Sequence, residues 1–517
     1  MPVSPTYPGI YIEETPSGVR TITGVSTSDT AFIDFFARGP VNDPVRITSF
    51  GDFDRVFGGL DRRSAASYAL QQYYLNGGQI AYVVRVTAGA AAKAGVTLAN
   101  GGSDIVRVEA ANEGVWGQRL RVTVTAVSGD VFNLKVEEVV GTQVVRTETF
   151  LNLTMDSTDA RYAVDVVSRD SQLIDLSRLS AAGSTTPPTP VSNQSLTGNT
   201  GDDGDEPGST TWRTTTGATA LAPSNPGSKT GMYALEKIAP FVFNLLCIPA
   251  AADLEDADMR AVYTAAITYC RDKRSFLFVD IPEDTDTLTD MNTWLSTNAN
   301  LRDDHAAVYF PRLEIPDALN GNRPRNVAPC GTLAGVYART DSARGIWKAP
   351  AGTEAVLRNA NVVFKMNDLE NGGLNQQGVN ALRNFPIYGN ISWGARTLNG
   401  ADQQASEYKY TPVRRVALYI EESLYQGLKW VVFEPNDEPL WAQIRLNVGA
   451  FMQNLFRQGA FQGKTPREAY LVKCDKETTT QNDINLGIVN ILVGFAPLKP
   501  AEFVIIKIQQ LAGQIEV

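Results

Sequence analysis

The stretch of the sequence that comes closest to a catalytic motif is a glycine-rich turn near the C-terminus. Residues 459–465 read Gly-Ala-Phe-Gln-Gly-Lys-Thr and end like a phosphate-binding loop. That motif needs its first glycine at position 458, which is Gln458 here, and it needs a preceding strand, whereas a long helix is expected before this turn. Pro466 follows at once. The pattern therefore predicts a helix-terminating turn and no nucleotide or other cofactor site.

The sequence has a single histidine, so any Ser-His-Asp triad, Cys-His pair or histidine-based metal site must include His305. This residue follows Asp303 and Asp304 and begins an apolar strand. Its position favours a structural or surface histidine over a catalytic base.

Clusters of acidic residues are the remaining candidates for chemistry. One loop carries four of them, Asp202, Asp203, Asp205 and Glu206. They could collect a calcium ion, but the loop lacks the ordered spacing of a calcium site, which favours a plain acidic loop. The glutamate pairs at 13–14 and 421–422 cannot point at one bond, because neighbouring side chains diverge on strands and helices. We therefore expect solvated or interface charges, with no metal site and no catalytic residues.

Composition limits the classes of partner. The 517 residues carry a net charge of -10 and a pI near 5.0, so nucleic acid is not an expected partner. A hydrophobic content of 43% suffices for several globular domains. The first residues lack the basic region and apolar run of a signal peptide, so a soluble chain made in the cytoplasm is expected. The scattered cysteines fit reduced core thiols, at Cys247, Cys270, Cys330 and Cys474.

Apolar patterning in the first half predicts a β-α-β unit followed by an insertion. Residues 30–37 and 80–86 are expected to be buried strands, with a helix between them at 64–75. From 105 to about 176, apolar and polar side chains alternate, which is typical of an antiparallel β-rich insertion. Residues 183–230 are rich in Ser, Thr, Pro, Gly and Asp and are expected to be a flexible linker or loop.

The second half predicts a parallel sheet and then an α+β unit. Apolar strands alternate with amphipathic helices, which indicates a mainly parallel α/β sheet; the strands are expected at 241–248, 276–281 and 306–310 and the helices at 255–270 and 285–296. The final region should contain two long helices and short strands, with helices at 411–427 and 441–459 and strands at 430–433 and 470–473.

We therefore expect a multidomain protein of the α/β and α+β classes. Its parts should be an N-terminal extended arm (1–25), an α/β sheet domain in two pieces (26–95 and 231–385), an inserted β-rich domain (96–182), the linker or loop (183–230) and a C-terminal α+β domain (386–517).

Two β segments lie at opposite ends of the chain. Residues 502–510, Glu-Phe-Val-Ile-Ile-Lys-Ile-Gln-Gln, are apolar on both faces. Residues 9–14, Gly-Ile-Tyr-Ile-Glu-Glu, are the second candidate and are bounded by Pro8 and Pro16. Exposed strands invite edge pairing, so each is expected either to lie within its own domain or to add a strand to a neighbouring copy.

An ordered series of motifs resembles contractile tail sheath proteins of phages and injection systems. In chain order the similar stretches are Asp341–Gly352 with Arg344 and Trp347, Gly378–Arg383, Trp393–Leu398 with Gly394 and Arg396, Arg414–Ser423 with Glu421 and Glu422, Phe433–Asn436, Gly463–Asp475 and Pro497–Phe503. The N-terminal Pro8–Glu14 and the Trp116-Gly117 turn are also similar, whereas the insertion and residues 183–230 match weakly.

This resemblance implies a structural protein and not an enzyme. It implies a helical tube of many copies around an inner tube, assembled long and then shortened irreversibly to drive the inner tube through a membrane. The implied partners are other copies of the chain, an inner tube protein, baseplate and terminator or cap proteins, and a AAA+ ATPase or chaperone. The implied location is a phage tail or injection particle, assembled in the bacterial cytoplasm and then released or attached to a membrane.

The resemblance also implies that terminal arms add strands to a small sheet in neighbouring subunits. The linking residues would be Ile10, Tyr11, Ile12, Glu13, Glu14, Phe503, Val504, Ile505, Ile506, Lys507 and Ile508, of which Glu13, Glu14 and Lys507 could fix the register. The charged faces of the helices within 414–457 could contact the inner tube or could simply be solvated. A static shell or surface-layer subunit would use strand exchange too, and it is the alternative function.

Overall fold

The computed structural model describes residues 20–238 and 243–507, which divide into two compact units. The larger unit consists of Ser26–Ala343 and Pro350–Thr411, and the smaller holds the described residues of Met1–Val25, Arg344–Ala349 and Pro412–Val517. Within the described ranges, no helix combines the length and the apolar character that crossing a membrane requires.

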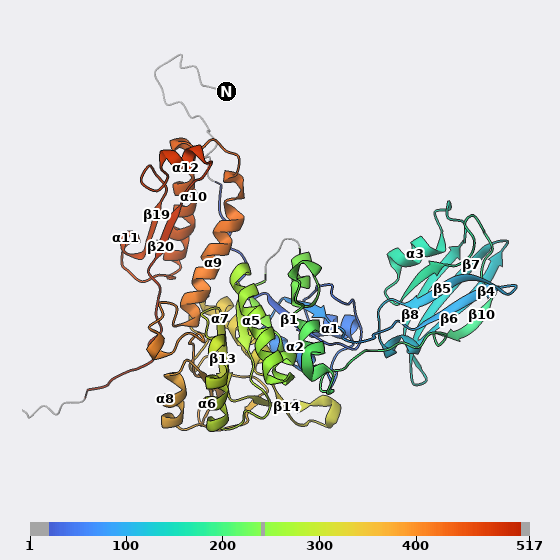
Figure 1. Cartoon of the computed structure of the whole chain (residues 1–517), viewed down its shortest axis with the longest axis horizontal. Helices are drawn as coiled ribbons and strands as arrows, with labels where there is room; N and C mark the ends of the chain where they lie inside the picture. The colour runs from blue at the N-terminus through green and yellow to red at the C-terminus, as the bar shows by residue number, and fades with distance from the viewer. Residues whose placement is uncertain (1–19, 239–242, 508–517) are drawn as a thin grey trace, which may run out of the picture. The chain divides into compact units, whose positions relative to one another are not determined.

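An eight-stranded sheet forms the centre of the larger unit in the part of the chain that the structure describes (Figure 1). The strand order is β18-β17-β13-β12-β11-β1-β3-β2. The bounds are β1 (Thr30–Asp34), β2 (Val45–Ile47), β3 (Ala81–Arg85), β11 (Leu245–Cys247), β12 (Phe276–Val279), β13 (Ala306–Phe310), β17 (Asn380–Phe385) and β18 (Gly389–Ser392). Only β2 and β18 run antiparallel to their neighbours. The mainly parallel α/β sheet predicted from the apolar runs is therefore confirmed.

Helices cover both faces of this sheet. On one face, α5 (Asp256–Lys273) packs Met259 and Val262 into the core with Ile33 of β1. The other face receives α2 (Ala65–Asn76) and α7 (Cys330–Arg344), because the ring of Tyr73 contacts Phe32 and that of Tyr337 contacts Phe278. The remaining elements around this sheet are α1 (Phe50–Phe57), α6 (Leu288–Thr297), α8 (Asp368–Asn375), β14 (Leu313–Asp317), β15 (Arg323–Val327) and β16 (Asn361–Val362), of which α6 and α8 share the core of α5.

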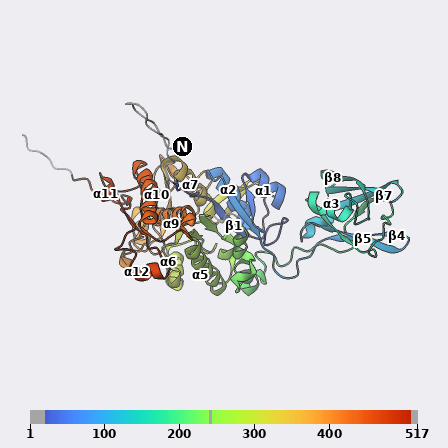
Figure 2. The ribbon, with the colours of Figure 1, turned by 90° about the horizontal axis from the view of Figure 1, so that it is seen from above.

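The chain between β3 and β11 contains two antiparallel sheets among its described residues, in the orders β4-β5-β9 and β10-β6-β7-β8. Their bounds are β4 (Gly95–Asn100), β5 (Ser103–Ala110), β6 (Leu120–Ser128), β7 (Val131–Val140), β8 (Gln143–Leu153), β9 (Ile174–Arg178) and β10 (Val191–Ser195). α3 (Ala163–Asp170) packs against β9 and β8 (Figure 2). The region is β-rich, as the alternating pattern predicts, and it extends beyond the expected 96–182 at both ends.

Residues 183–230 are not the flexible linker or loop that their composition suggests. β10 pairs with β6, and the adjacent Leu196 is fully buried. Trp212 is also fully buried and belongs to the core of the parallel sheet, followed by α4 (Gly217–Leu221). Residues 183–230 are therefore ordered by the pairing of their main chain and by the burial of a single tryptophan, although their average composition is polar.

Two helices and a small sheet make up most of the smaller unit. The helices are α9 (Thr411–Gly427) and α10 (Glu438–Arg457), whose Ile420 and Ile444 share one core. β19 (Tyr470–Lys473) and β20 (Leu492–Phe495) form an antiparallel pair beside α10 (Figure 1). Two short helices, α11 (Pro466–Ala469) and α12 (Gln481–Asn485), complete the unit.

Two further expectations are wrong. Residues 430–433 form no strand, because 3₁₀ geometry at Lys429–Val431 and a positive φ of 71° at Phe433 turn the chain between α9 and α10. The domain boundary expected between 385 and 386 falls inside the β17–β18 hairpin, and the chain up to Thr411 stays with the larger unit. Antiparallel pairing to the last parallel strand holds these residues there.

Trp212 tests the correction to residues 183–230. Trp212→Ala should lower the free energy of unfolding of the larger unit by about 3–5 kcal/mol, because a large buried ring is replaced by a cavity. Thr211→Ala, at the exposed neighbouring position, should change it by less than about 0.5 kcal/mol. Chemical denaturation followed by far-UV circular dichroism measures both free energies of unfolding. If Trp212→Ala were as stable as the wild type, the linker interpretation would be restored.

Candidate functional site

The glycine-rich turn after α10 is closed by its own chain. Lys464 N–H donates to Glu468 Oε2 at 2.9 Å, and Gln462 N–H donates to the carbonyl of Ala496 at 2.9 Å. Only the four-residue α11 follows. Because these amides are already used, the turn offers no cradle of donors to a phosphate group, and the predicted helix-terminating turn is confirmed.

His305 is buried in an ionic cluster. Its Nδ1 lies 3.0 Å from Asp303 Oδ1 and 2.9 Å from Asp304 Oδ1. Arg271 pairs with the other carboxylate oxygen of Asp303. Burial alone would raise the pKa of Asp303, but the hydrogen bonds from His305 and Arg271 lower it to about 2. The three residues have the proximity of metal ligands, yet Arg271 already pairs with Asp303, which supports the structural role expected for His305.

The acidic loop is held by an arginine from far along the chain. Arg63 Nη1 lies 2.8 Å from Asp203 Oδ2 and 2.5 Å from Glu206 Oε1. The other oxygen of Asp203 accepts from the N–H of Val115 at 3.0 Å, and Asp203 is only 3% exposed. The acidic loop expected here is therefore more than a run of surface charges, because Asp203 is buried and paired with Arg63 within the larger unit.

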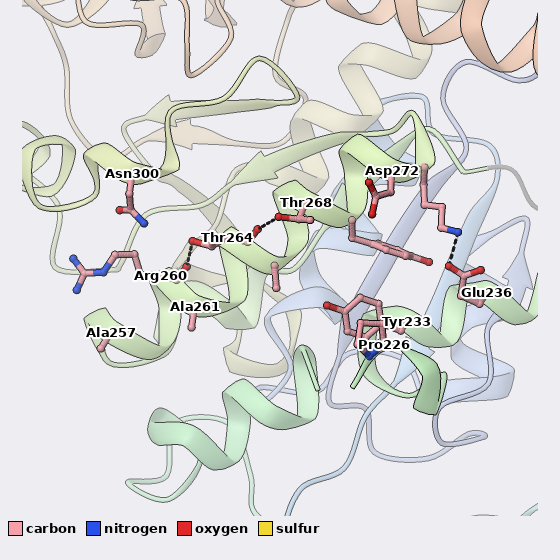
Figure 3. A pocket seen from close by; sticks show the side chains of 13 residues that line it. Pro226, Tyr233, Glu236, Ala257, Arg260, Ala261, Thr264, Thr268, Asp272 and Asn300 are labelled. Carbon is pink, nitrogen blue, oxygen red and sulfur yellow. Dashed lines mark hydrogen bonds and ion pairs between the residues drawn. The ribbon is translucent and has the colours of Figure 1, made fainter. Parts of the chain in front are cut away.

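A groove of about 620 Å³ runs along one face of α5 (Figure 3). The hydroxyls of Thr264 and Thr268 donate to carbonyls four residues earlier in the same helix, at 2.7 and 3.0 Å. Lys273 Nζ lies 2.6 Å from Glu236 Oε1. The residues that line this groove include no histidine, cysteine or serine. The two threonine hydroxyls are bound within α5 and the lysine is paired with Glu236, so these residues form no pair of nucleophile and base.

The last described residues expose an apolar segment. Phe503, Val504, Ile505 and Ile506 are between 75% and 82% exposed, and Lys507 is exposed as well. No strand forms over residues 502–507, so this part of the expected terminal strand pairs with no strand among the described residues. The other linking residues expected from the sequence, Ile10, Tyr11, Ile12, Glu13, Glu14 and Ile508, lie outside the described residues.

The sheet β19–β20 has one covered face and two open edges. Val472 and Val493 pack against the core of the smaller unit, whereas Leu471 and Leu492 are 51% and 52% exposed. Among the described residues no third strand pairs with either outer edge. A two-stranded sheet alone is marginally stable in water. The unit thus combines an unpaired apolar segment with a sheet that can accept strands.

Residues 403–510, which contain this sheet and the exposed segment, match the family described as the phage tail sheath C-terminal domain. Over 183 residues, or 35% of the chain, the sequence is 27% identical to the tail sheath protein of Vibrio phage KVP40. That match spans about a quarter of the phage protein, 26% of its length.

The sheath fold extends over nearly the whole chain. The sheath of an extracellular contractile injection system, the PVC complex in its contracted state, superposes with a TM-score of 0.59 and 21% identity over 99% of both chains. The contracted helical sheath of the anti-feeding prophage gives 0.55 and 22% over 98% of this chain and 100% of that one. The sheath tail protein of Listeria innocua gives 0.57 and 14% over 92% and 96%. At these identities the similarity shows a shared multidomain α/β fold.

Three residues of the sheath motifs build one joint of the larger unit. The Arg396 side chain is fully buried, and its Nη1 lies 2.9 Å from Asp402 Oδ1. A Cβ at Gly394 would lie 2.8 Å from Asn380, so only glycine fits there. Trp393 remains 40% exposed, with its ring centroid 4.8 Å from that of Phe385. These motif residues position the chain after β18 and form no site for a small molecule.

The other sheath motif residues lie in the smaller unit. Trp347 packs against its hydrophobic core, three residues after Arg344, which is exposed at the end of α7. Glu421 is exposed, as expected for an interface charge. Glu422 is only 8% exposed and accepts a hydrogen bond from Gln426 Nε2 at 2.6 Å. The expectation of a solvated or interface charge is therefore wrong for Glu422, which is buried within the chain, because successive residues of α9 point in different directions.

Sequence reasoning found only one strand of the sheet β19–β20. The strand expected at 470–473 coincides with β19, whereas β20 was not predicted as a strand. The available signal was the short run Leu-Val-Gly-Phe after a polar turn, which is too brief to distinguish from a loop.

Two buried carboxylates lie at the carboxyl ends of parallel strands, where α/β folds place their ligands. Asp34 ends β1, and its Oδ2 accepts from the N–H of Ala66 in α2 at 2.6 Å. Asp280 follows β12, and its Oδ1 accepts from the N–H of Cys330, the first residue of α7, at 3.2 Å. Burial raises the pKa of Asp34 to about 7 and that of Asp280 to about 6. The two carboxyl groups therefore bind main-chain N–H groups in the first turns of α2 and α7.

The raised pKa values predict a pH-dependent stability. A carboxyl group with a folded-state pKa above its unfolded value of about 3.9 stabilises the fold while protonated, and this contribution is lost as pH rises through the folded-state pKa. Relative to Asp280→Asn, the wild type should therefore lose on the order of 2–3 kcal/mol of unfolding free energy between about pH 4 and pH 7. Denaturant titrations across this range measure the difference. The exposed control Asp284→Asn should show no such trend, and a wild type that gains stability relative to Asp280→Asn would contradict the assignment.

Proposed function

We propose that this chain is a sheath subunit that polymerises by strand exchange into a contractile helical tube around an inner tube. The observation that carries the proposal is the combination, in one unit, of the exposed apolar segment at 503–506 and the open-edged sheet β19–β20. An extended segment that finds no partner in its own chain gains both main-chain hydrogen bonds and apolar burial by adding to the sheet of another copy.

The expected gain from one such addition is substantial. In a strand, Phe503 and Ile505 point to one face and Val504 and Ile506 to the other. Burial of one such pair contributes roughly 3–6 kcal/mol, at roughly 1.5–3 kcal/mol for each side chain. The donor and acceptor surfaces differ, so the contact is heterologous and propagates as a helix when it does not close into a ring.

The N-terminal arm is proposed to make the second link. Ile10, Tyr11 and Ile12 would supply the strand, while Glu13, Glu14 and Lys507 would fix the register of the joined strands. Connection through main-chain hydrogen bonds keeps neighbouring subunits attached while their other contacts change. The charged faces of α9 and α10 are candidates for contact with the inner tube.

Contraction is proposed to release energy stored during assembly. The extended lattice would be trapped kinetically, and the contracted lattice would bury more surface, so that no nucleotide is consumed by the sheath itself. The similar PVC and anti-feeding prophage structures are contracted sheaths, and a further one is a baseplate of the anti-feeding prophage, which supports both the shortened state and a baseplate partner. An inner tube protein, a terminator or cap and a AAA+ ATPase or chaperone complete the proposed set of partners.

Removal of the donor segment tests strand exchange directly. Deletion of Ala501–Val517 should leave a folded protein that cannot form tubes, because the unit keeps its core and its acceptor sheet but loses the strand that links it. Circular dichroism and negative-stain electron microscopy measure the two properties. Deletion of Leu511–Val517, beyond the expected strand, is the matched control and should still polymerise.

The same deletion variant gives a second, dose-dependent result. Its acceptor sheet is intact, so it should cap growing wild-type tubes, and a one-tenth admixture should shorten their mean length severalfold. Tubes of unchanged length, or tubes formed by the deletion variant alone, would falsify linkage by the C-terminal strand.

The number of lattice forms separates a contractile sheath from a static shell or surface-layer subunit. Particles assembled with the inner tube protein and baseplate should be long and narrow, and exposure to denaturant or acid should convert them to short, wide tubes of different pitch. Helical reconstruction by electron microscopy measures both forms. A single pitch under every condition would favour the static alternative.

A further inference from the structure

The sheet β19–β20 has an outer face that strand exchange does not cover. In this antiparallel pair Leu471 lies opposite Gly494, and Leu492 lies opposite Lys473. Side chains that are directly opposed, or two apart in one strand, point to the same face, so these four residues form the outer face. Both leucines are about half-exposed there, and Lys473 pairs with Glu477. The inner face packs against the core of the smaller unit.

An added strand makes this outer face larger, a step that rests on the proposed function. The apolar segment 503–506 alternates between the two faces of any sheet that it joins, so one of its two pairs of side chains must point outward. That pair would lie beside Leu471 or Leu492, depending on which edge accepts the strand. The sheet with one strand added, here called the completed sheet, therefore carries an apolar outer patch of the kind that marks a contact with a partner.

The helix α10 has a second uncovered surface in the same unit. All of α10 is described, and the residues exposed between Glu438 and Arg457 are uncharged; they are Pro439, Ala442, Gln443, Leu446, Ala450 and Asn454. The one other charged residue of the helix, Arg445, lies 2.7 Å from Glu438 and is only half-buried by its surroundings. Leu446 is 52% exposed. The cores of protein interfaces are depleted in charged residues in the same way.

Gly449 lies on this uncharged face, three residues after Leu446 in the interior of α10. No atom of the described chain lies within 4 Å of the position that its Cβ would occupy. Glycine destabilises the interior of a helix relative to alanine, and no contact within the described chain requires it here. A surface that approaches the α10 backbone closely from outside the subunit would require it.

We propose that the outer face of the completed sheet in one subunit packs on the uncharged face of α10 in another copy of the chain. A helix laid on a sheet buries the apolar side of both elements, which is how layered folds form their cores. The sheet presents Leu471 and Leu492, and Gly449 leaves room for a projecting side chain beside the helix backbone. The two surfaces differ, so the contact is heterologous and repeats from copy to copy.

Cross-linking between single-cysteine variants tests this contact. The native cysteines are all buried, so Leu446→Cys and Leu492→Cys each introduce one accessible thiol. Chains that carry the two substitutions separately, with different tags, are mixed, assembled into tubes and treated with a short bismaleimide. We expect a cross-linked dimer that contains one chain of each kind. Leu446→Cys mixed with Leu369→Cys, at an exposed position on α8, is the control and should give no dimer.

Gly449→Leu tests the close approach to α10. The larger side chain should block the sheet of the neighbouring copy and raise the critical concentration for tube formation roughly tenfold or more. The isolated subunit should melt no lower than the wild type, because leucine favours a helix more than glycine does. Gly373→Leu, at an equally open position on α8, is the matched control and should assemble as the wild type does.

Two results would overturn the contact: wild-type-like assembly of Gly449→Leu, or tubes of the mixed single-cysteine chains that yield no dimer. Cross-linking of Leu446→Cys to the inner tube protein in complete particles would assign the face to that partner instead. These variants keep the segment 503–506 and the open sheet edges, so their results do not depend on the Ala501–Val517 deletion. Tubes formed by that deletion would contradict strand exchange, and the two failures are therefore distinguishable.

Discussion

A strand edge with no partner is the constraint on which the rest of this molecule depends. Main-chain donors and acceptors of a sheet must be satisfied by another strand or by water, and apolar side chains make water a poor choice. The smaller unit carries both halves of that problem, an apolar segment at 503–506 and the two-stranded sheet β19–β20. Under the proposed strand exchange, one addition between copies would resolve both, and polymerisation would then follow from local chemistry.

Much of the larger unit could be predicted because its signals are local. The uninterrupted apolar strand β12 ends just before Asp280 and Pro282. The helix α2 is capped by Ser64 at its start and by Gly77 at its end, and both residue types are typical of helix caps. The ordered segment around Trp212 could not be predicted, because it depends on a partner strand and a core that lie elsewhere in the chain. The average composition of a segment does not tell which residues elsewhere in the chain pack against it.

The candidate site likewise has features that the sequence predicts and features that it does not. The exposed segment at 503–506 was recognisable from its own side chains, since four apolar residues in a row need a partner. The burial of Asp203 by Arg63, and of Glu422 on the inner side of α9, rests on contacts that spacing does not encode. The motifs resemble those of tail sheath proteins even where such contacts were invisible, the family model matches residues 403–510, and the fold is similar to that of a sheath structure over nearly the whole chain.

The open sheet β19–β20 also links folding to concentration. If a neighbour supplies its missing strands, this element of tertiary structure is completed only in the polymer, and the stability of each subunit rises with the number of copies present. An isolated subunit would then be an unfinished fold, least stable in its C-terminal unit. Dilution would act on that unit as a mild denaturant does, and assembly would be its final folding step.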